Sequence, residues 1–345
     1  MKKTKHLFIV AIIMIIALLS SCNQTETITC SECGADIPGD AIFCTKCGSS
    51  VTTETTLATE ATQGTENTDS SHGFETGSVG LTYEIYSDLK TCTITGIGSC
   101  TDSNVIIPEV IDGYKVIAIA AYAFSDCTTI KEITIPETVT SIGLQAFDFC
   151  RSLTNITIPD SVTSIGEWAF YNCTSLTNIT IPDSVTSIGE GAFTQCASLT
   201  SITIPDSVTS IGSSAFFKCT SLTSITIPDS VTSIGDGAFA DCTSLESIAI
   251  PDSVTSIEDG AFYNCTSLTS ATIGKGITSI DEQTFAGCTS LTSVIIGKGV
   301  TSIDWSAFFD CTSLKDVYYT GTAAEWMAIS GRSNVHATIH FDSDN

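Results

Sequence analysis

Nine phenylalanines recur every 23 residues, and a cysteine follows each of them three residues later, from Cys127 to Cys311. A fixed period of this size is typical of a solenoid, in which each repeat buries its apolar face against the next. A chain of nearly identical coils favours a long binding surface over one irregular catalytic pocket. The phenylalanines are Phe124, Phe147, Phe170, Phe193, Phe216, Phe239, Phe262, Phe285 and Phe308.

One coil shows the pattern, the segment from Leu222 to Thr243 with the sequence LTSITIPDSVTSIGDGAFADCT. Around Ile225 and Ile227 apolar and polar residues alternate, which indicates a short strand with one buried face. Pro228 ends this strand because it lacks a backbone donor, and the aspartate after it favours a turn. The spacing around Phe239 indicates a short helical or irregular segment with one apolar side. The coil therefore predicts one short strand and a convex segment.

The unit LTxITIPDSVTSIGxxAFxxCTS resembles the BspA-type (treponemal) leucine-rich repeat of bacterial surface proteins, over about residues 105–319. The segment YYTGTAAEWMAIS, from Tyr318 to Ser330, resembles the closing segment of that family. The resemblance implies a right-handed leucine-rich-repeat solenoid. It also implies a surface or secreted protein with a role in adhesion or recognition, as in relatives that bind host matrix proteins or other bacteria.

The N-terminus predicts export from the cytoplasm. Three lysines precede a 13-residue apolar run from Leu7 to Leu19, which suits a signal peptide and is short for a membrane span. The run ends in Leu19-Ser20-Ser21-Cys22, which resembles a bacterial lipobox with cleavage before Cys22. The resemblance implies a diacylglycerol anchor on the Cys22 sulfur, and an uncleaved signal anchor is the alternative. Either reading places the rest of the chain outside the cytoplasmic membrane.

Four cysteines, here called the ribbon cysteines, follow the anchor as two C-x-x-C-G knuckles: Cys30, Cys33, Cys44 and Cys47. Two such knuckles direct four thiolates at one point, which favours a structural zinc with no open coordination position. The stretch also resembles the short zinc ribbons of other bacterial proteins. A segment this small has almost no core, so the metal would supply its folding free energy. Two disulfides or a redox pair are the alternatives, because oxidation is usual outside the membrane.

The composition and pattern of the other segments predict the remaining domain boundaries. Residues 49–71 hold 12 serines and threonines and four acids without lysine, arginine or proline, which predicts a flexible linker. Two alternating stretches at residues 81–104 predict a hairpin that caps the first coil. The predicted domains are the signal peptide at 1–21, the anchor and zinc ribbon at 22–48, the linker at 49–77, the capping hairpin at 78–104, the solenoid at 105–319 and a C-terminal cap at 320–345.

The candidate binding surface is a polar ladder between the strand isoleucines, at Thr157, Thr180, Thr203 and Thr226. With the asparagines and serines two residues earlier, it predicts a flat polar sheet on the concave face. The alternative is that recent duplication of the repeats left it uniform. A turn position carries a row of acids from Glu137 to Asp252, which either binds calcium or repeats a proline-aspartate turn with screened charges.

We predict that the chain is not an enzyme, because no nucleophile motif, phosphate loop or pair of catalytic carboxylates stands out. The cysteine ladder is expected to pack as small buried apolar side chains. The formal net charge of −25 argues against nucleic acid and anionic lipid as partners. We expect a lipid-anchored, surface-exposed protein that binds an extracellular protein or glycan and no small-molecule substrate. The alternatives are an envelope spacer without a ligand, or a non-catalytic protein that presents carbohydrate to a partner.

Overall fold

The computed structural model describes residues 27–29, 36–38 and 77–341. The chain divides into two compact units, residues 1–59 and 60–345. In the first unit, strand β1 (Thr27–Thr29) pairs antiparallel with strand β2 (Asp36–Pro38). Cys22 and the four ribbon cysteines lie outside the described residues, so the anchor and the zinc site stay predictions.

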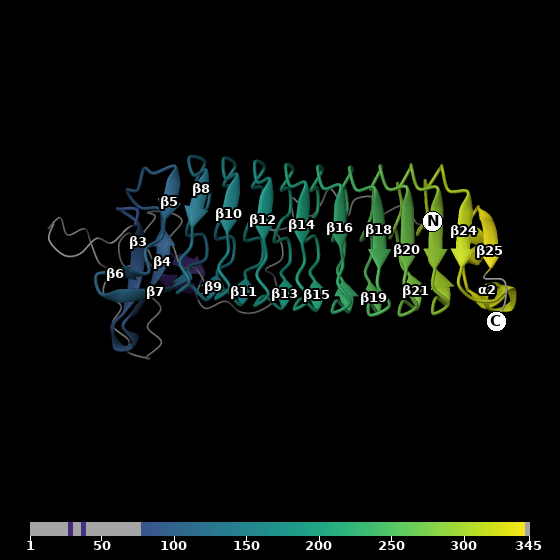
Figure 1. The fold of residues 1–345 in the computed structure, drawn as a ribbon, viewed down its shortest axis with the longest axis horizontal. Helices are drawn as coiled ribbons and strands as arrows, with labels where there is room; N and C mark the ends of the chain where they lie inside the picture. The colour runs from purple at the N-terminus through teal and green to yellow at the C-terminus, as the bar shows by residue number, and fades with distance from the viewer. Residues whose placement is uncertain (1–26, 30–35, 39–76, 342–345) are drawn as a thin grey trace. The chain divides into compact units, whose positions relative to one another are not determined.

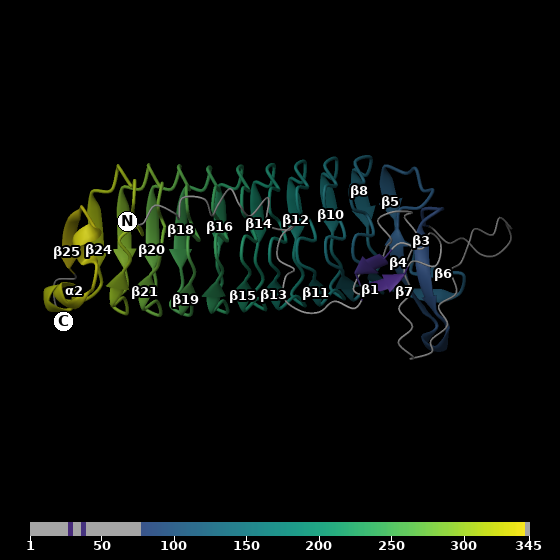
Figure 2. The ribbon, with the colours of Figure 1, turned by 180° about the vertical axis from the view of Figure 1, so that it is seen from behind.

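The second unit is a β-solenoid with little helix, as the 23-residue period predicts (Figures 1 and 2). Its first ladder consists of a six-stranded and a five-stranded parallel sheet, and every strand lies one coil from its neighbour. The coils stand side by side in a row along the long axis of the solenoid (Figure 1). The strands of this ladder are β5 (Asn104–Ile106), β8 (Glu132–Thr134), β10 (Asn155–Thr157), β12 (Asn178–Thr180), β14 (Ser201–Thr203), β16 (Ser224–Thr226), β18 (Ser247–Ile250), β20 (Ser270–Ile273), β22 (Ser293–Ile296), β24 (Asp316–Tyr319) and β25 (Thr338–Phe341).

Each full coil contributes two strands, where the sequence predicted one. The second ladder is made of Ser-Ile pairs that follow the turn at the end of each first-ladder strand, for example β15 next to β17, with Ile211 beside Ile234. A pair of residues is too short for alternation to be visible in the sequence. The strands are β9 (Ser141–Ile142), β11 (Ser164–Ile165), β13 (Ser187–Ile188), β15 (Ser210–Ile211), β17 (Ser233–Ile234), β19 (Ser256–Ile257), β21 (Ser279–Ile280) and β23 (Ser302–Ile303).

The convex segment of each coil is a series of turns, without an α-helix. In one coil Gly237 and Asp241 both have left-handed backbone angles, with φ of 58° and 59°. Two left-handed residues four positions apart prevent a right-handed helix from continuing. The backbone instead bonds to the next coil, as the Phe216 N–H does to the Ala238 carbonyl at 2.7 Å.

The core is a column of stacked phenylalanines flanked by isoleucine, leucine, valine and cysteine side chains. Phe216 is fully buried between Phe193 and Phe239, with ring centroids 5.5 and 5.2 Å away and near-parallel planes. The same stacking runs through all nine phenylalanines from Phe124 to Phe308. A regular column of this kind fixes the register of the coils.

Both ends of the solenoid are covered. At the N-terminal end β3 (Thr82–Tyr86) and β4 (Thr91–Gly96) form an antiparallel hairpin joined by a 3-10 turn, η2 (Ser87–Leu89). Strand β4 pairs with β7 (Tyr114–Ile119), which also pairs with β6 (Val110–Ile111) and continues the second ladder through β9. These pairs satisfy backbone groups that the first coil would otherwise leave open.

At the C-terminal end, helix α2 (Ala323–Ala328) begins at a capping box in which Thr322 and Glu325 bond to each other's backbone N–H groups. Its Trp326 is buried beside Tyr319 at a centroid distance of 5.3 Å. A 3-10 turn, η3 (Arg332–Asn334), then leads into β25, which pairs parallel with β24. The segment from Tyr318 to Ser330 thus closes the core.

Candidate functional site

The outward side chains of the first ladder form one continuous surface, here called the threonine face. In β10, β12, β14 and β16 the two flanking residues are exposed and the central isoleucine is buried. Because the strands pair in register, each threonine lies beside the next along the axis. The structure therefore brings together the four predicted residues, Thr157, Thr180, Thr203 and Thr226.

These threonine hydroxyls are free to bond a ligand, whereas other hydroxyls of the same coils are bonded to the backbone. Thr177 and Thr223, three residues before Thr180 and Thr226, donate their hydroxyls to backbone carbonyls of the preceding coil. Within residues 77–341 the hydroxyls of the four face threonines have no hydrogen-bond partner. An exposed hydroxyl offers one donor and two acceptor sites. The face therefore presents repeated hydrogen-bonding groups with an inter-strand spacing of about 4.8 Å.

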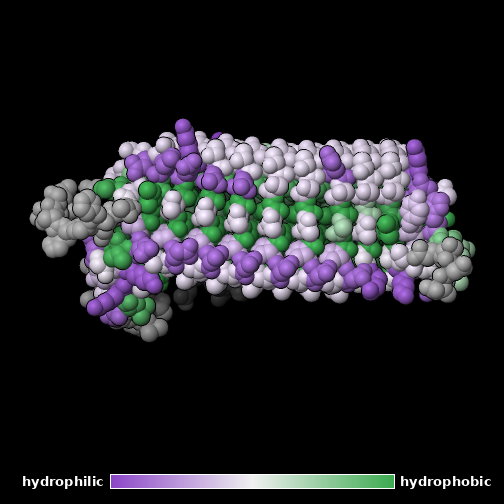
Figure 3. Space-filling view, in the orientation of Figure 1, coloured by the Kyte–Doolittle hydropathy of each residue, from purple (hydrophilic) through white to green (hydrophobic). Residues whose placement is uncertain are grey.

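A row of carboxylates, here called the acid row, runs along the turn that ends each strand of the threonine face. All six members are exposed, and Figure 3 shows a hydrophilic band along the length of the solenoid beside the sheet. Each follows a proline that ends the strand, so the row follows directly from the repeat. The members are Glu137, Asp160, Asp183, Asp206, Asp229 and Asp252.

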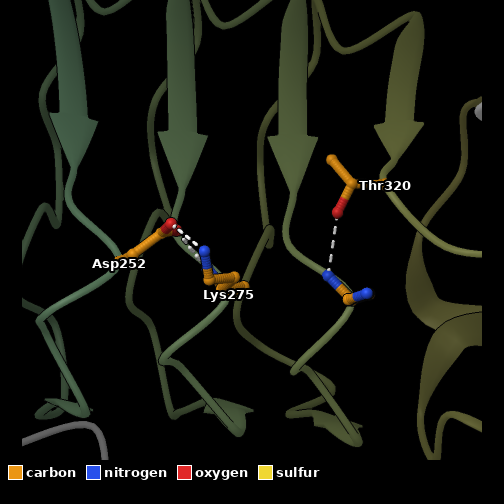
Figure 4. A network of polar contacts seen from close by, with 4 residues as sticks. Asp252, Lys275 and Thr320 are labelled. Carbon is orange, nitrogen blue, oxygen red and sulfur yellow. Dashed lines mark hydrogen bonds and ion pairs between the residues drawn. The ribbon is translucent and has the colours of Figure 1, made fainter.

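The acid row ends where lysine replaces aspartate. Lys275 Nζ lies 2.6 Å from the Asp252 carboxylate, and the Lys275 backbone N–H also donates to Asp252 at 2.9 Å (Figure 4). The hydrogen bonds from Lys275 lower the pKa of Asp252, and the same contact raises the pKa of Lys275. Asp252 is thus neutralised by Lys275 of the next coil. One coil further on, the Lys298 N–H donates to Thr320 Oγ1 at 2.9 Å.

The threonine face changes character toward the C-terminus, beyond the four threonines that the sequence analysis singled out. In register with the threonines lie Ile295, Tyr318 and His340, the first two of them exposed. The His340 ring stacks on Tyr318 at 4.6 Å, and its Nε2 lies 2.7 Å from the Asp316 carboxylate. The 23-residue period could have placed Tyr318, but His340 follows it by 22 residues and lies off the period.

The cysteine ladder belongs to the core. The thiol of Cys242 donates to the Phe216 carbonyl of the preceding coil at 3.2 Å, and the other ladder thiols from Cys150 onward do likewise. Burial raises the pKa of Cys127 to about 11 and that of Cys311 to about 12. Thiols held protonated in this way are poor nucleophiles and poor metal ligands.

Within the described residues, no group of three or more histidine, cysteine or acidic side chains is arranged to hold a metal ion. Four acids, Asp236, Glu258, Asp259 and Asp281, line a shallow depression on the solenoid. Burial and the neighbouring Asp259 and Glu258 raise the pKa of Asp236. Across that part of the chain no helix has the length and apolarity needed to cross a bilayer.

The chain belongs to the BspA-type leucine-rich repeat family. The model described as "BspA type Leucine rich repeat region (6 copies)" matches residues 99–223 and 209–327. The model of a zinc-ribbon domain matches residues 29–51, which include the four ribbon cysteines. The predicted family and fold class are thereby confirmed, and a zinc site in the first unit gains support.

Solved structures of bacterial leucine-rich-repeat proteins are similar to this chain. A leucine-rich cell surface protein from Faecalibacterium prausnitzii is 30% identical, with 77% of this chain and 99% of that chain covered and a TM-score of 0.40. A leucine-rich repeat protein from Bacteroides ovatus is 24% identical, with 76% and 98% covered and a TM-score of 0.42. The leucine-rich repeat protein of T. pallidum is 23% identical, with 77% and 98% covered and a TM-score of 0.32. No curated protein matches the chain.

Proposed function

We propose that this chain is a lipid-anchored protein of the bacterial surface whose threonine face binds an extracellular protein or glycan. The observation that carries the proposal is the ladder of exposed, unpartnered hydroxyls at Thr157, Thr180, Thr203 and Thr226. Proteins of this repeat family are typically non-catalytic scaffolds for binding, which supports an interaction role. The cell-surface description of the Faecalibacterium relative supports the location.

The N-terminal unit would hold the solenoid at the membrane. Cys22 would carry the lipid, and the ribbon cysteines would bind one structural zinc, in agreement with the zinc-ribbon match at residues 29–51. Four thiolates fill a tetrahedral zinc, so the metal would stabilise the fold and leave no position for a substrate. The serine- and threonine-rich residues 49–77 would separate this unit from the solenoid.

Charge substitutions on the threonine face test the proposal. Two triple variants are needed, in which Thr180, Thr203 and Thr226 are all changed to glutamate or all to lysine. Purified variants are tested against a panel of extracellular matrix proteins and glycans, with affinities measured for every ligand that the natural chain binds. If a ligand binds this face, its affinity should change at least tenfold in one of the two variants, because the new charge or the loss of a hydroxyl contact opposes binding.

The matched control places three glutamates on the second ladder, at Ser164, Ser187 and Ser256, which are equally exposed. This control should bind as the natural chain does. If both threonine variants are folded and bind with unchanged affinity, the threonine face is not the binding surface. If the natural chain binds no member of the panel, the spacer alternative gains support.

A further inference from the structure

The acid row is uncompensated over the central coils. Within residues 77–341 the carboxylates of Asp160, Asp183, Asp206 and Asp229 form no ion pair, since the two pairs found there involve Asp252 and Asp316. Between residues 152 and 274 the single cationic side chain is Lys218, which lies over the Phe217 ring at 5.0 Å. Exposed carboxylates about 4.8 Å apart repel one another, so an added positive charge is favourable here.

The segments that flank the solenoid do not supply that charge. Residues 49–77 hold five acids and no lysine or arginine, and residues 342–345 add two more acids. A second copy of the solenoid would bring an identical negative row to the same face. Like charges brought face to face cost several kcal/mol in an interface. The occupant of this surface is therefore a different molecule.

The direction of the two rows and the residue types on this surface indicate what kind of ligand it binds. The acid row and the threonine ladder both run along the axis of the solenoid, so the ligand that contacts both is extended. The outward residues of β10 to β18 are asparagine, serine, threonine and one alanine, without an aromatic ring for a sugar to stack on. In an extended polypeptide, alternate side chains point to one side about 6.6–7 Å apart, and the flexible stems of lysine and arginine absorb the difference from the row.

We propose that the threonine face between β10 and β18 binds an extended, lysine- or arginine-rich segment of another protein, whose cationic side chains lie on the acid row and whose backbone meets the threonine hydroxyls. This inference rests on the proposed function and specifies its partner. Charge complementarity of this kind accelerates association and selects the partner by its charge.

The experiment uses the full-length chain in neutral detergent and a fluorescent 12-residue peptide of alternating lysine and serine, with binding followed by fluorescence anisotropy. Asp183→Asn, Asp206→Asn and Asp229→Asn are combined in one variant, since asparagine suits the same turn and removes the charge. The control combines Glu167→Gln, Glu190→Gln and Glu282→Gln, three exposed acids in the turn after the second strand. Both variants lose the same net charge.

We expect the acid-row variant to weaken binding at least tenfold and the control to change it less than twofold. Raising NaCl from 20 to 200 mM should weaken binding further, because salt screens exposed charges. Equal losses in the two variants would mean attraction to net charge alone and would overturn the proposal, as would absence of binding.

The threonine variants separate this inference from the proposed function. The triple lysine variant should bind the basic peptide more weakly than the natural chain does, and the triple glutamate variant should not. If cellohexaose or another neutral glycan binds instead, and the glutamate or lysine variants change its affinity, the basic-partner inference is overturned while the proposed function stands.

Discussion

Replacing Phe216 by alanine tests whether the phenylalanine column holds the solenoid together. The ring is fully buried and stacks on Phe193 and Phe239, at centroid distances of 5.5 and 5.2 Å. The backbone contacts do not need the ring, because the Phe216 N–H bonds to Ala238 and the Phe216 carbonyl accepts from the Cys242 thiol. Removal of a buried phenylalanine ring costs about 3–5 kcal/mol. Each of the two lost aromatic contacts contributes about 0.5–1.5 kcal/mol to the destabilisation.

Phe308→Ala is the matched comparison at the end of the column. Phe308 is 9% exposed and stacks on one ring, Phe285, at 5.6 Å. With one aromatic contact in place of two, its replacement should cost about 0.5–1.5 kcal/mol less than that of Phe216. Because each coil contacts only its neighbours, the loss at Phe216 should spread to both sides, whereas that at Phe308 should stay near the C-terminus.

Guanidinium denaturation gives the free energies, and hydrogen exchange with mass spectrometry locates the loosened coils. Peptides that span residues 190–265 should exchange faster in Phe216→Ala, and those near the hairpin at residues 82–96 should not. A destabilisation by Phe216→Ala below about 1 kcal/mol, or an equal cost for the two substitutions, would refute the reasoning that stacked neighbours determine the stability of each coil.

Four further outcomes are expected. Iodoacetamide at pH 8 should label Cys100 in the native protein before Cys219, because burial raises the pKa of Cys219 well above its usual value; equal rates would show an open core. Lowering the pH from 7 should stabilise the natural chain as Asp236 gains its proton, since a carboxyl with a raised folded-state pKa binds protons more tightly when folded, and Asp236→Asn should reduce that gain in the thermal midpoint. Metal analysis should find one zinc per chain, released together with the fold of the first unit by a chelator, and two disulfides among the ribbon cysteines in native mass spectra would contradict this. Cys22→Ala should abolish incorporation of labelled palmitate and release the protein from membranes, whereas unlabelled natural protein would exclude the lipid anchor.

The sequence was sufficient for the features that every coil repeats. The 23-residue period predicted the solenoid, and alternation around Ile202 and Ile225 predicted which side chains of the first ladder face outward. The burial of the cysteines also followed from their apolar neighbours. In each case one residue type recurs at one position, so local pattern and tertiary packing agree.

The turn geometry could not be predicted in the same way. The left-handed position before each cysteine is occupied by Asn172, Gln195, Lys218 and Asp241 in successive coils. Only some of these residue types favour such angles on their own. Bonds to the next coil impose the conformation, as between the Lys218 N–H and the Ala240 carbonyl at 2.9 Å. Because stacking sets this conformation, no particular residue type is required at the position, and a single sequence therefore does not reveal it.

The candidate site also has a part that the sequence predicted and a part that it did not. The threonine ladder was predictable because it lies within the repeat, and the acid row was visible because proline precedes each of its members. The stack of His340 on Tyr318 was not, because β25 follows a helix and a 3-10 turn and leaves the 23-residue period. Its place in the sheet depends on how the helix around the buried Trp326 closes the last coil. Residues at the ends of a solenoid are placed by the packing of the cap, so their contribution to the threonine face emerges only in three dimensions.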